Sequence, residues 1–250
     1  MLVPQLPSWS TLGLGLGLLL LCLPTLAIAQ NSDSLQSIDI SLEEAPTQLD
    51  KDAILNTNSS WVFDFTAQDT YGFNPGGITL AEAKTFPATV GNGLTMSLVT
   101  LGPCAMQPPH YHPRASNYIV SVDGEVQTYM ITENAAPLVS NTLTPGKMTL
   151  FPRGALHAMQ NTASAEDNSS LTSAPGCSNV TLVSALDDTD SGIHTIAMGL
   201  FNLPQDIVFA AMGLGQNVNF ESLKDGIPQL GAGIILGSDI CRQQCGMEAS

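Results

Sequence analysis

The sequence has little charge, and very little of it is positive. Charged residues make up 12% of its 250 residues, with 7 Lys and Arg against 22 Asp and Glu, so the formal net charge is −15. Nucleic acids and anionic membrane surfaces both bind basic patches, and we exclude them as partners on that ground. Hydrophobic residues make up 44%, too large a share for a disordered chain. Because the chain also lacks a charged or Pro/Ser-rich linker, we expect one globular unit.

Long apolar runs are missing except near the N-terminus. Residues 12–26 (LGLGLGLLLLCLPTL) are almost wholly apolar, and the small residues Ala27 and Ala29 precede a polar stretch. The run is short for a membrane span, so we predict a signal peptide over residues 1–29 in preference to a membrane anchor. The mature protein is then expected to be secreted and extracellular, without a membrane contact. In that setting three Asn-X-Ser/Thr triplets are candidate glycosylation sites, at Asn58, Asn168 and Asn179.

Cysteine is scarce, and one of the five lies in the predicted signal peptide. The four that remain in the mature chain are Cys104, Cys177, Cys241 and Cys245. In an oxidising compartment four cysteines predict two disulfides, with three pairings open. Cys241 and Cys245 are close in sequence and could pair locally, which would leave Cys104 with Cys177. A thiolate metal site is the alternative, but the spacing and the compartment are both poor for it.

Short strand-like runs broken by Gly, Pro and Asn fill the middle of the chain. From Trp61 onward the apolar runs are rich in β-branched residues: WVFDF, GGITL, LTMSLVTL, NYIVSV, EVQTYMI, KMTLF, NVTLVSAL and GIHTIAM. This spacing predicts an all-β sandwich or barrel over residues 61–200. Residues 30–60 are polar, and we expect an extended N-terminal arm with at most one short helix. Residues 201–250 are expected to form a C-terminal extension of short helices, at 204–213 and 219–224.

Two histidines stand one residue apart in the stretch PPHYHP. Alternate side chains on a strand point to the same face, so His110 and His112 can coordinate one metal ion if this segment is extended. Such pairs also arise by chance, and the pair alone is weak evidence for a metal site. Residues 117–131 downstream read as two strands around Asp123-Gly124, which predicts a β-hairpin.

A third histidine follows a tight turn further along the chain. Residues 146–161 predict a strand, a Pro-Arg-Gly turn, and then His157 entering the next strand. Because barrel closure brings distant strands together, an inward His157 would complete a three-histidine metal site.

These two stretches resemble the paired motifs of the cupin family, G-x5-H-x-H-x3,4-E-x6-G and G-x5-P-x-G-x2-H-x3-N. The second motif matches at each fixed position, namely Gly146, Pro152, Gly154, His157 and Asn161. The first matches at His110, His112 and Gly124, but has Cys104 in place of the opening Gly and Asn117 in place of the carboxylate ligand. The similarity spans about residues 63–245 and is nearest to the spherulin-like secreted germin-type proteins. It implies a single jelly-roll β-barrel.

In germins, three histidines and a glutamate usually bind manganese, and family activities include oxalate oxidase, oxalate decarboxylase and superoxide dismutase. The resemblance therefore implies a metal bound by His110, His112 and His157, with Asn117 at the fourth position. An amide brings no negative charge, so this set suits Zn²⁺, Cu²⁺ or Ni²⁺ relatively better than Mn²⁺. Arg114 and Arg153 lie near the motifs and could attract a small anion. The sequence assigns no catalytic residue.

Two classes of function follow from the resemblance. The first is a metalloenzyme acting on a small oxygenated anion such as oxalate or superoxide. The second is a non-catalytic protein of the cell wall or extracellular matrix, with a cell-wall component as its partner. The lost carboxylate favours the second class, whereas the three retained histidines favour the first. Germin-type barrels often form trimers or hexamers through their helical tails, so the resemblance also implies a homo-oligomer.

Overall fold

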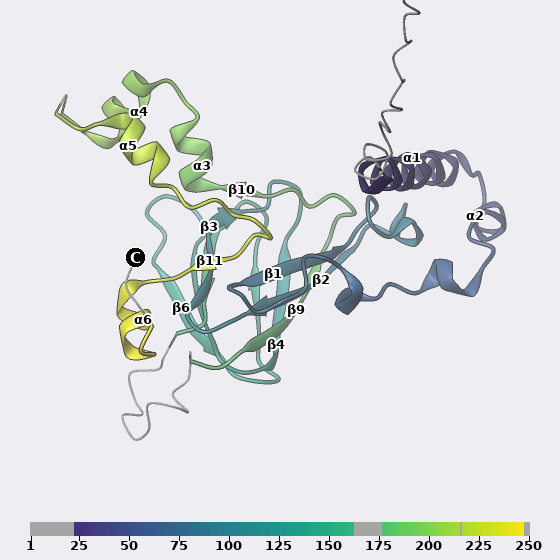
Figure 1. Cartoon of the computed structure of the whole chain (residues 1–250), viewed down its shortest axis with the longest axis horizontal. Helices are drawn as coiled ribbons and strands as arrows, with labels where there is room; N and C mark the ends of the chain where they lie inside the picture. Colours follow the sequence, from purple (N-terminus) through teal and green to yellow (C-terminus); the bar gives the residue numbers. More distant parts are fainter. Residues whose placement is uncertain (1–22, 163–176, 216, 248–250) are drawn as a thin grey trace, which may run out of the picture.

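Two antiparallel β-sheets face each other and enclose the core (Figure 1). The computed structural model describes residues 23–162, 177–215 and 217–247. One sheet has the order β1 (Gly76–Ala81), β2 (Thr95–Leu101), β9 (Val180–Leu186), β4 (Asn117–Asp123) and β7 (Met148–Phe151). The other has the order β10 (His194–Thr195), β3 (Ala105–Tyr111), β8 (Leu156–Gln160), β5 (Val126–Ile131) and β6 (Val139–Leu143), and β11 (Ile235–Leu236) also pairs with β3. The expected all-β, jelly-roll architecture is confirmed.

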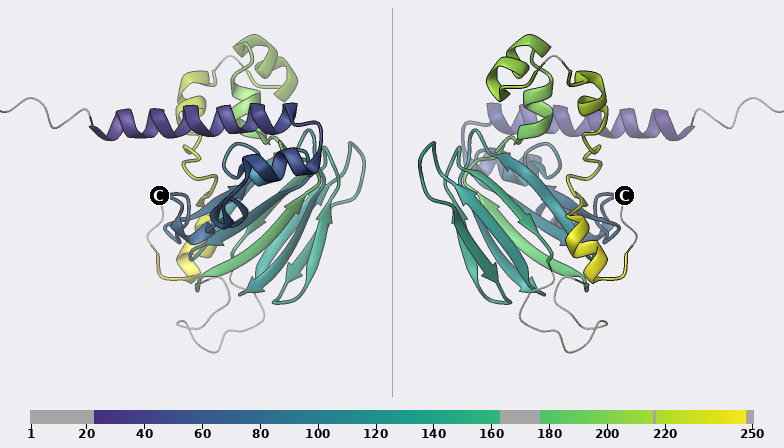
Figure 2. Two further views of the ribbon diagram at one scale, coloured as in Figure 1. Left: turned by 90° about the vertical axis from the view of Figure 1, so that its right-hand side faces the viewer. Right: turned by 90° about the vertical axis from the view of Figure 1, so that its left-hand side faces the viewer.

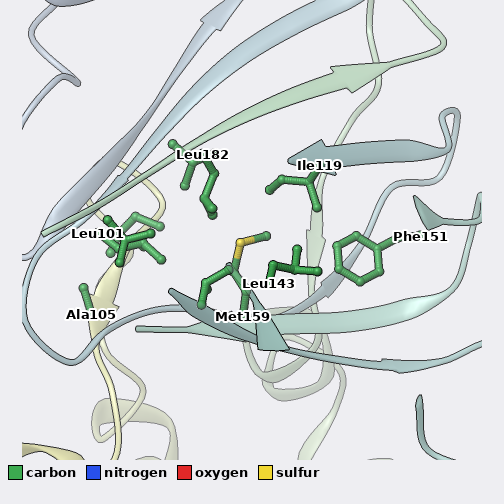
Figure 3. Packing of buried hydrophobic residues seen from close by; sticks show 11 residues of the cluster. Leu101, Ala105, Ile119, Leu143, Phe151, Met159 and Leu182 are labelled. Atoms are coloured by element: carbon green, nitrogen blue, oxygen red, sulfur yellow. The ribbon is translucent and has the colours of Figure 1, made fainter. Parts of the chain in front are cut away.

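The core lies between the sheets because alternate residues of each strand point inward. On β9 each second side chain is buried, from Val180 through Leu182 to Leu186. Figure 3 shows how inward residues of both sheets meet, including Leu101, Ile119 and Met159. The side chain of Leu182 is wholly buried. This apolar layer surrounds the inward polar groups described below.

The N-terminal region contains helices, so the expected extended arm is wrong. Helix α1 (Leu23–Glu44) is followed by α2 (Gln48–Ile54) and by the 3-10 turns η1 (Asn58–Trp61) and η2 (Phe65–Ala67), where a strand was predicted. Leu42 of α1 packs with Leu55 and with Val90, which follows η3 (Pro87–Thr89). A capping box between Thr47 and Asp50 starts α2. Tertiary packing therefore gives this polar segment a helical structure that its composition did not indicate.

The predicted signal peptide falls largely outside the described residues. Its last residues, 23–29, form the start of α1, and the predicted cleavage point after Ala29 lies within that helix. Among the residues that the structure describes, no helix combines the length and the apolar character needed to cross a membrane. Of the three glycosylation acceptors, Asn58 and Asn179 are exposed, and Asn168 lies outside the described residues.

Two of the C-terminal helices, α4 (Gln205–Met212) and α5 (Phe220–Asp225), lie at the positions predicted for them. Helix α3 (Ile196–Phe201) begins inside the run GIHTIAM, so the strand predicted there is limited to β10 and the rest is helical. Helix α6 (Asp239–Gln244) had no predicted position of its own. Helix α4 ends at Gly213, whose positive φ of 64° suits a residue without a side chain. Between α5 and α6 the short strand β11 returns to the barrel and pairs with β3, which the sequence did not predict. Figure 2 shows α3 to α5 and α1 gathered toward the same end of the barrel, with α6 against its side.

The predicted hairpin at Asp123-Gly124 is wrong, because its two strands belong to different sheets. Strand β4 pairs with β7 and β9, whereas β5 pairs with β6 and β8. Gly124 has a φ of 77°, and Ser121 Oγ donates a hydrogen bond to the Gly124 carbonyl across the turn. The Asp-Gly pair marks a sharp change of direction, as expected, but this change carries the chain across the barrel.

The two disulfides pair Cys104 with Cys241 and Cys177 with Cys245. The local Cys241–Cys245 pairing considered above is therefore wrong, and so is Cys104–Cys177. Cys241 lies in α6 and Cys245 follows one turn later, so both project from the same side of the helix. Cys104 precedes β3 and Cys177 precedes β9, and both bonds thus fasten α6 to the barrel.

The sulfur atoms of the two disulfides are close neighbours. The Sγ atoms of Cys104 and Cys245 lie 3.6 Å apart, although they belong to different bonds. Three of the cysteines are near enough to share an ion. Because each sulfur is already bonded to another sulfur, none is the thiolate that a metal site requires.

Candidate metal centre

Three histidine side chains meet inside one end of the barrel. His110 lies on β3 and His157 lies opposite it on β8, at a point where the register between the two strands shifts. His112 follows the end of β3. The ring centroids of His110 and His157 are 4.1 Å apart, and those of His110 and His112 are 5.2 Å apart. The predicted convergence of the three imidazoles is confirmed.

Backbone carbonyls fix the orientation of all three rings. Nδ1 of His110 donates to the Pro108 carbonyl at 2.8 Å, and Nδ1 of His157 donates to the Ala155 carbonyl at 2.8 Å. Nδ1 of His112 donates to the Gly192 carbonyl at 2.7 Å. Because a carbonyl can only accept, each Nδ1 carries the proton and each Nε2 carries a lone pair. The rings are therefore in the tautomer that metal-binding histidines use through Nε2.

The Nε2 atoms of the three rings lie close together in the interior of the barrel. One ring nitrogen of each histidine lies within 4.8 Å of those of the other two. Nε2 of His110 and Nε2 of His157 are buried without a hydrogen-bond partner. A buried polar atom with no partner is costly, and a bound metal ion would satisfy both at once. The donor set thus fits a divalent transition metal.

Burial also keeps the imidazoles neutral. It lowers the pKa of His110 well below the usual 6.5, and the neighbouring His157 lowers that pKa further. Burial likewise lowers the pKa of His157, to about 4, and lowers the pKa of His112. Neutral imidazole is the form that binds metals, so the three histidines can bind a cation without first losing protons.

An aromatic ring supports His157 from the core side. Phe151, the last residue of β7, stacks on His157 with centroids 4.1 Å apart and planes inclined by 16°. Phe151 is 1% exposed and belongs to the hydrophobic core (Figure 3). This contact could not be predicted from the sequence, because the two residues occupy different sheets on either side of the Pro-Arg-Gly turn.

Asn117 lies beside the histidine cluster, at the start of β4. Its Nδ2 is 3.4 Å from Nε2 of His112, and its Oδ1 accepts a hydrogen bond from the hydroxyl of Ser184 on β9. Asn117 and Ser184 are both buried. Ser184 was not predicted as a site residue, and a single serine within an alternating strand carries no sequence signal that would have marked it.

The two arginines near the motifs are paired with aspartates of one loop. Arg114 donates to the Asp190 side chain at 2.6 Å and also to the Asp190 backbone carbonyl. Arg153 lies 3.9 Å from the carboxylate of Asp187. Both guanidinium groups are about half exposed. The same loop includes Gly192, whose carbonyl orients His112, so these ion pairs flank the segment that holds one of the three rings.

The last residue of the second motif has a structural role. Asn161 is fully buried, and its Nδ2 donates to the carbonyls of Gly102 and Ser178, each at 2.7 Å. It thereby links the segments that precede β3 and β9.

Comparison with known proteins agrees with the fold and with the site. The family model described as Cupin matches residues 65–219. That range contains the three histidines, Asn117 and the described strands of both sheets except β11. The chain therefore belongs to the cupin family.

Among characterised relatives, the chain is similar to spherulins and germin-like proteins. It is 31% identical to Spherulin-1A of Physarum polycephalum over 209 residues, which is 82% of this chain and 77% of that protein. It is 30% identical to Germin-like protein 1-1 of Oryza sativa subsp. japonica, over 56% of this chain and 67% of that protein.

A solved structure of oxalate oxidase superposes with a TM-score of 0.55 at 22% identity, covering 66% of this chain and 80% of that one. At this identity the superposition supports the shared fold.

Proposed function

We propose that this protein is a germin-type metalloprotein that holds one divalent transition metal through Nε2 of His110, His112 and His157. The observation that carries the proposal is the convergence of these rings with each Nδ1 already donating to a carbonyl. Three residues arranged only for packing would not leave two buried ring nitrogens without partners. A metal ion accounts for the orientation and for the unpartnered atoms together.

Manganese is the metal implied by the family, and a fold neighbour, the oxalate decarboxylase of Bacillus subtilis, is described as having Mn(II) centres. This chain offers three neutral imidazoles and an amide, without a carboxylate. Neutral nitrogen ligands favour Zn²⁺, Cu²⁺ and Ni²⁺ over Mn²⁺. We therefore infer that manganese binds more weakly here than in a site that has the carboxylate, and that zinc, copper or nickel competes with it.

The proposed substrate is a small oxygenated anion, with oxalate and superoxide as the first candidates. A bound metal would supply a Lewis acid or a redox centre. The protein would contribute a buried setting, fixed rings and neutral ligands that leave the charge of the ion uncompensated. Arg114 and Arg153 would add positive potential at the loop beside the site, reduced by their pairing with Asp190 and Asp187.

Export from the cell fits the covalent structure. Two disulfides form and persist in oxidising compartments. The proposal that the mature protein is extracellular also rests on the N-terminal apolar run and on the exposed acceptors Asn58 and Asn179. Mass spectrometry of natively secreted material would test it through the mature N-terminus and the attached glycans.

A homo-oligomer is the proposed assembly. The segment between β10 and β11, which contains α3 to α5, presents apolar side chains to solvent, namely Met198, Leu203, Ile207, Met212 and Leu223. Exposed apolar groups gathered on one part of a surface commonly mark contacts between proteins. Sedimentation of the purified protein would test this, and a monomer at micromolar concentration would contradict it.

Elemental analysis of natively secreted protein is the main experiment. We expect close to one metal ion per chain, lost in a His110→Ala variant that keeps the same β-sheet circular dichroism. Oxalate consumption and superoxide dismutation are then measured on the same samples. Activity that requires both the metal and His110 would support the proposal that the protein is a metalloenzyme.

The second candidate is a non-catalytic wall or matrix protein, favoured by the amide that replaces the family carboxylate. Stoichiometric metal without either activity would support this candidate. If neither the wild-type protein nor the His110→Ala variant contains bound metal, the metal-binding proposal itself is refuted.

A further inference from the structure

The amide of Asn117 has two chemically different ends, and the structure fixes which of them faces the histidines. The oxygen accepts a hydrogen bond from the Ser184 hydroxyl, while the NH₂ group lies toward Nε2 of His112 at 3.4 Å. An amide oxygen can coordinate a metal, whereas an amide nitrogen that carries two hydrogens can only donate hydrogen bonds. The orientation of this one group therefore decides whether Asn117 is a ligand.

Ser184 holds this orientation from the neighbouring strand. It lies on β9, which pairs with β4, and it is 1% exposed, so water does not compete for its hydroxyl. The hydrogen bond turns the amide oxygen toward β9 and leaves the NH₂ group on the side of Nε2 of His112. A carboxylate at position 117 would present only acceptors on that side.

We propose that Asn117, positioned by Ser184, donates a hydrogen bond to an anion at the open coordination position of the metal and is not itself a ligand. The inference rests on the proposed three-histidine metal site. Three neutral ligands leave both positive charges of the ion uncompensated, so the fourth position attracts an anion. An N–H donor beside that position stabilises the anion further, since hydrogen bonds to charged groups are the strong ones.

The ligand class is a small anion with a second acceptor atom one or two bonds away from the atom bound to the metal. Superoxide, oxalate and azide all meet this condition. The family carboxylate would neutralise part of the metal charge and repel such an anion. Replacing it with an amide therefore weakens metal binding and strengthens anion binding. Asn117 would then be the residue that determines anion binding, and Ser184 a positioning residue.

Azide binding to the Co(II)-loaded full-length protein tests this. The dissociation constants of Co(II) and of azide are measured separately, the first by competition with a chelator and the second from the visible spectrum of the Co(II) centre. For Asn117→Ala we expect Co(II) affinity within about threefold of wild type and azide affinity weaker by about 10-fold or more, the effect of one lost hydrogen bond to a charged group. Co(II) affinity reduced tenfold or more would show that Asn117 is a ligand and would overturn the proposal. Unchanged azide affinity would overturn it as well.

Ser184→Ala tests the positioning role without altering Asn117. Its amide can then turn its oxygen toward the metal, so we expect weaker azide binding with Co(II) affinity equal to or above that of wild type. Ser97→Ala is the matched control, because Ser97 is also buried and lies opposite Ser184 on β2. Equal azide affinity in the two serine variants would refute the role of Ser184. If the wild-type protein does not bind Co(II), the three-histidine site itself is wrong, and this outcome is distinct from every outcome above.

Discussion

Replacing Phe151 with alanine removes the ring that supports His157 and should affect two measurable quantities. The side chain is 1% exposed, and its ring lies 4.1 Å from that of His157 in a stacked arrangement. Deleting a buried phenylalanine side chain costs about 3–5 kcal/mol of unfolding free energy, and the lost ring contact is included in that figure. Urea denaturation of metal-free protein, followed by circular dichroism, measures this cost.

The second expected effect is on metal affinity. Without Phe151 the imidazole of His157 keeps its hydrogen bond to Ala155 but loses the surface that restricts its rotation. Changes to groups that orient a metal ligand typically weaken binding about 10- to 100-fold. Competition with a chelator, under conditions in which wild type and variant are both folded, measures the loss.

Leu182→Ala provides the control for this experiment. Leu182 is 0% exposed and belongs to the same core cluster on β9. Its loss should cost about 2–5 kcal/mol of stability through the cavity that it leaves. It should leave metal affinity close to wild type. If the two variants reduce metal affinity equally, the effect comes from general loosening of the barrel, and the supporting role of Phe151 is refuted.

Three further predictions follow from the site and from the covalent links. Burial holds the pKa of His157 at about 4 against 6.5 in the unfolded chain, so the unfolded state alone gains this proton as pH falls from 6.5. Metal-free protein should lose about 3 kcal/mol of unfolding free energy from this group as pH falls from about 6.5 to about 4, and urea titrations of a His157→Leu variant should show a shallower pH dependence. A Cys177→Ser/Cys245→Ser double variant removes a link across 68 residues and should lower the unfolding free energy by about 4 kcal/mol. Equal urea midpoints in the double variant and the wild type would contradict this prediction. Asn117→Glu should raise the ratio of bound manganese to zinc in elemental analysis, and identical ratios in variant and wild type would contradict the charge argument.

Much of the three-histidine cluster could be predicted from the sequence because it depends on short-range features. The placement of His110 and His112 on one face follows from strand alternation within three residues. His157 could be placed because the Pro-Arg-Gly turn fixes where its strand begins. The convergence of these two segments was expected from barrel closure and from the resemblance to a known barrel family, since no local feature determines which strands become neighbours.

The features that were missed depend on long-range contacts. An Asp-Gly turn has the same local geometry whether its strands pair or separate, so the crossing from β4 to β5 carried no sequence signal. Strand β6 lies at a sheet edge and is largely exposed, so it lacks the alternation that identifies a half-buried strand. The helical character of α1 at Leu42 depends on partners that are distant in sequence, Leu55 and Val90. The direction of the Asn117 amide likewise depends on a serine that is 67 residues away.

The two disulfides have a consequence for the order in which this protein can mature during its synthesis. Cys104 and Cys177 emerge from the ribosome well before their partners, which lie near the C-terminal end of the chain. In a compartment that oxidises thiols, these two early cysteines can react with each other while α6 is still being made. Correct maturation then needs either a barrel that folds quickly enough to keep them apart or a disulfide isomerase that corrects the bond after release.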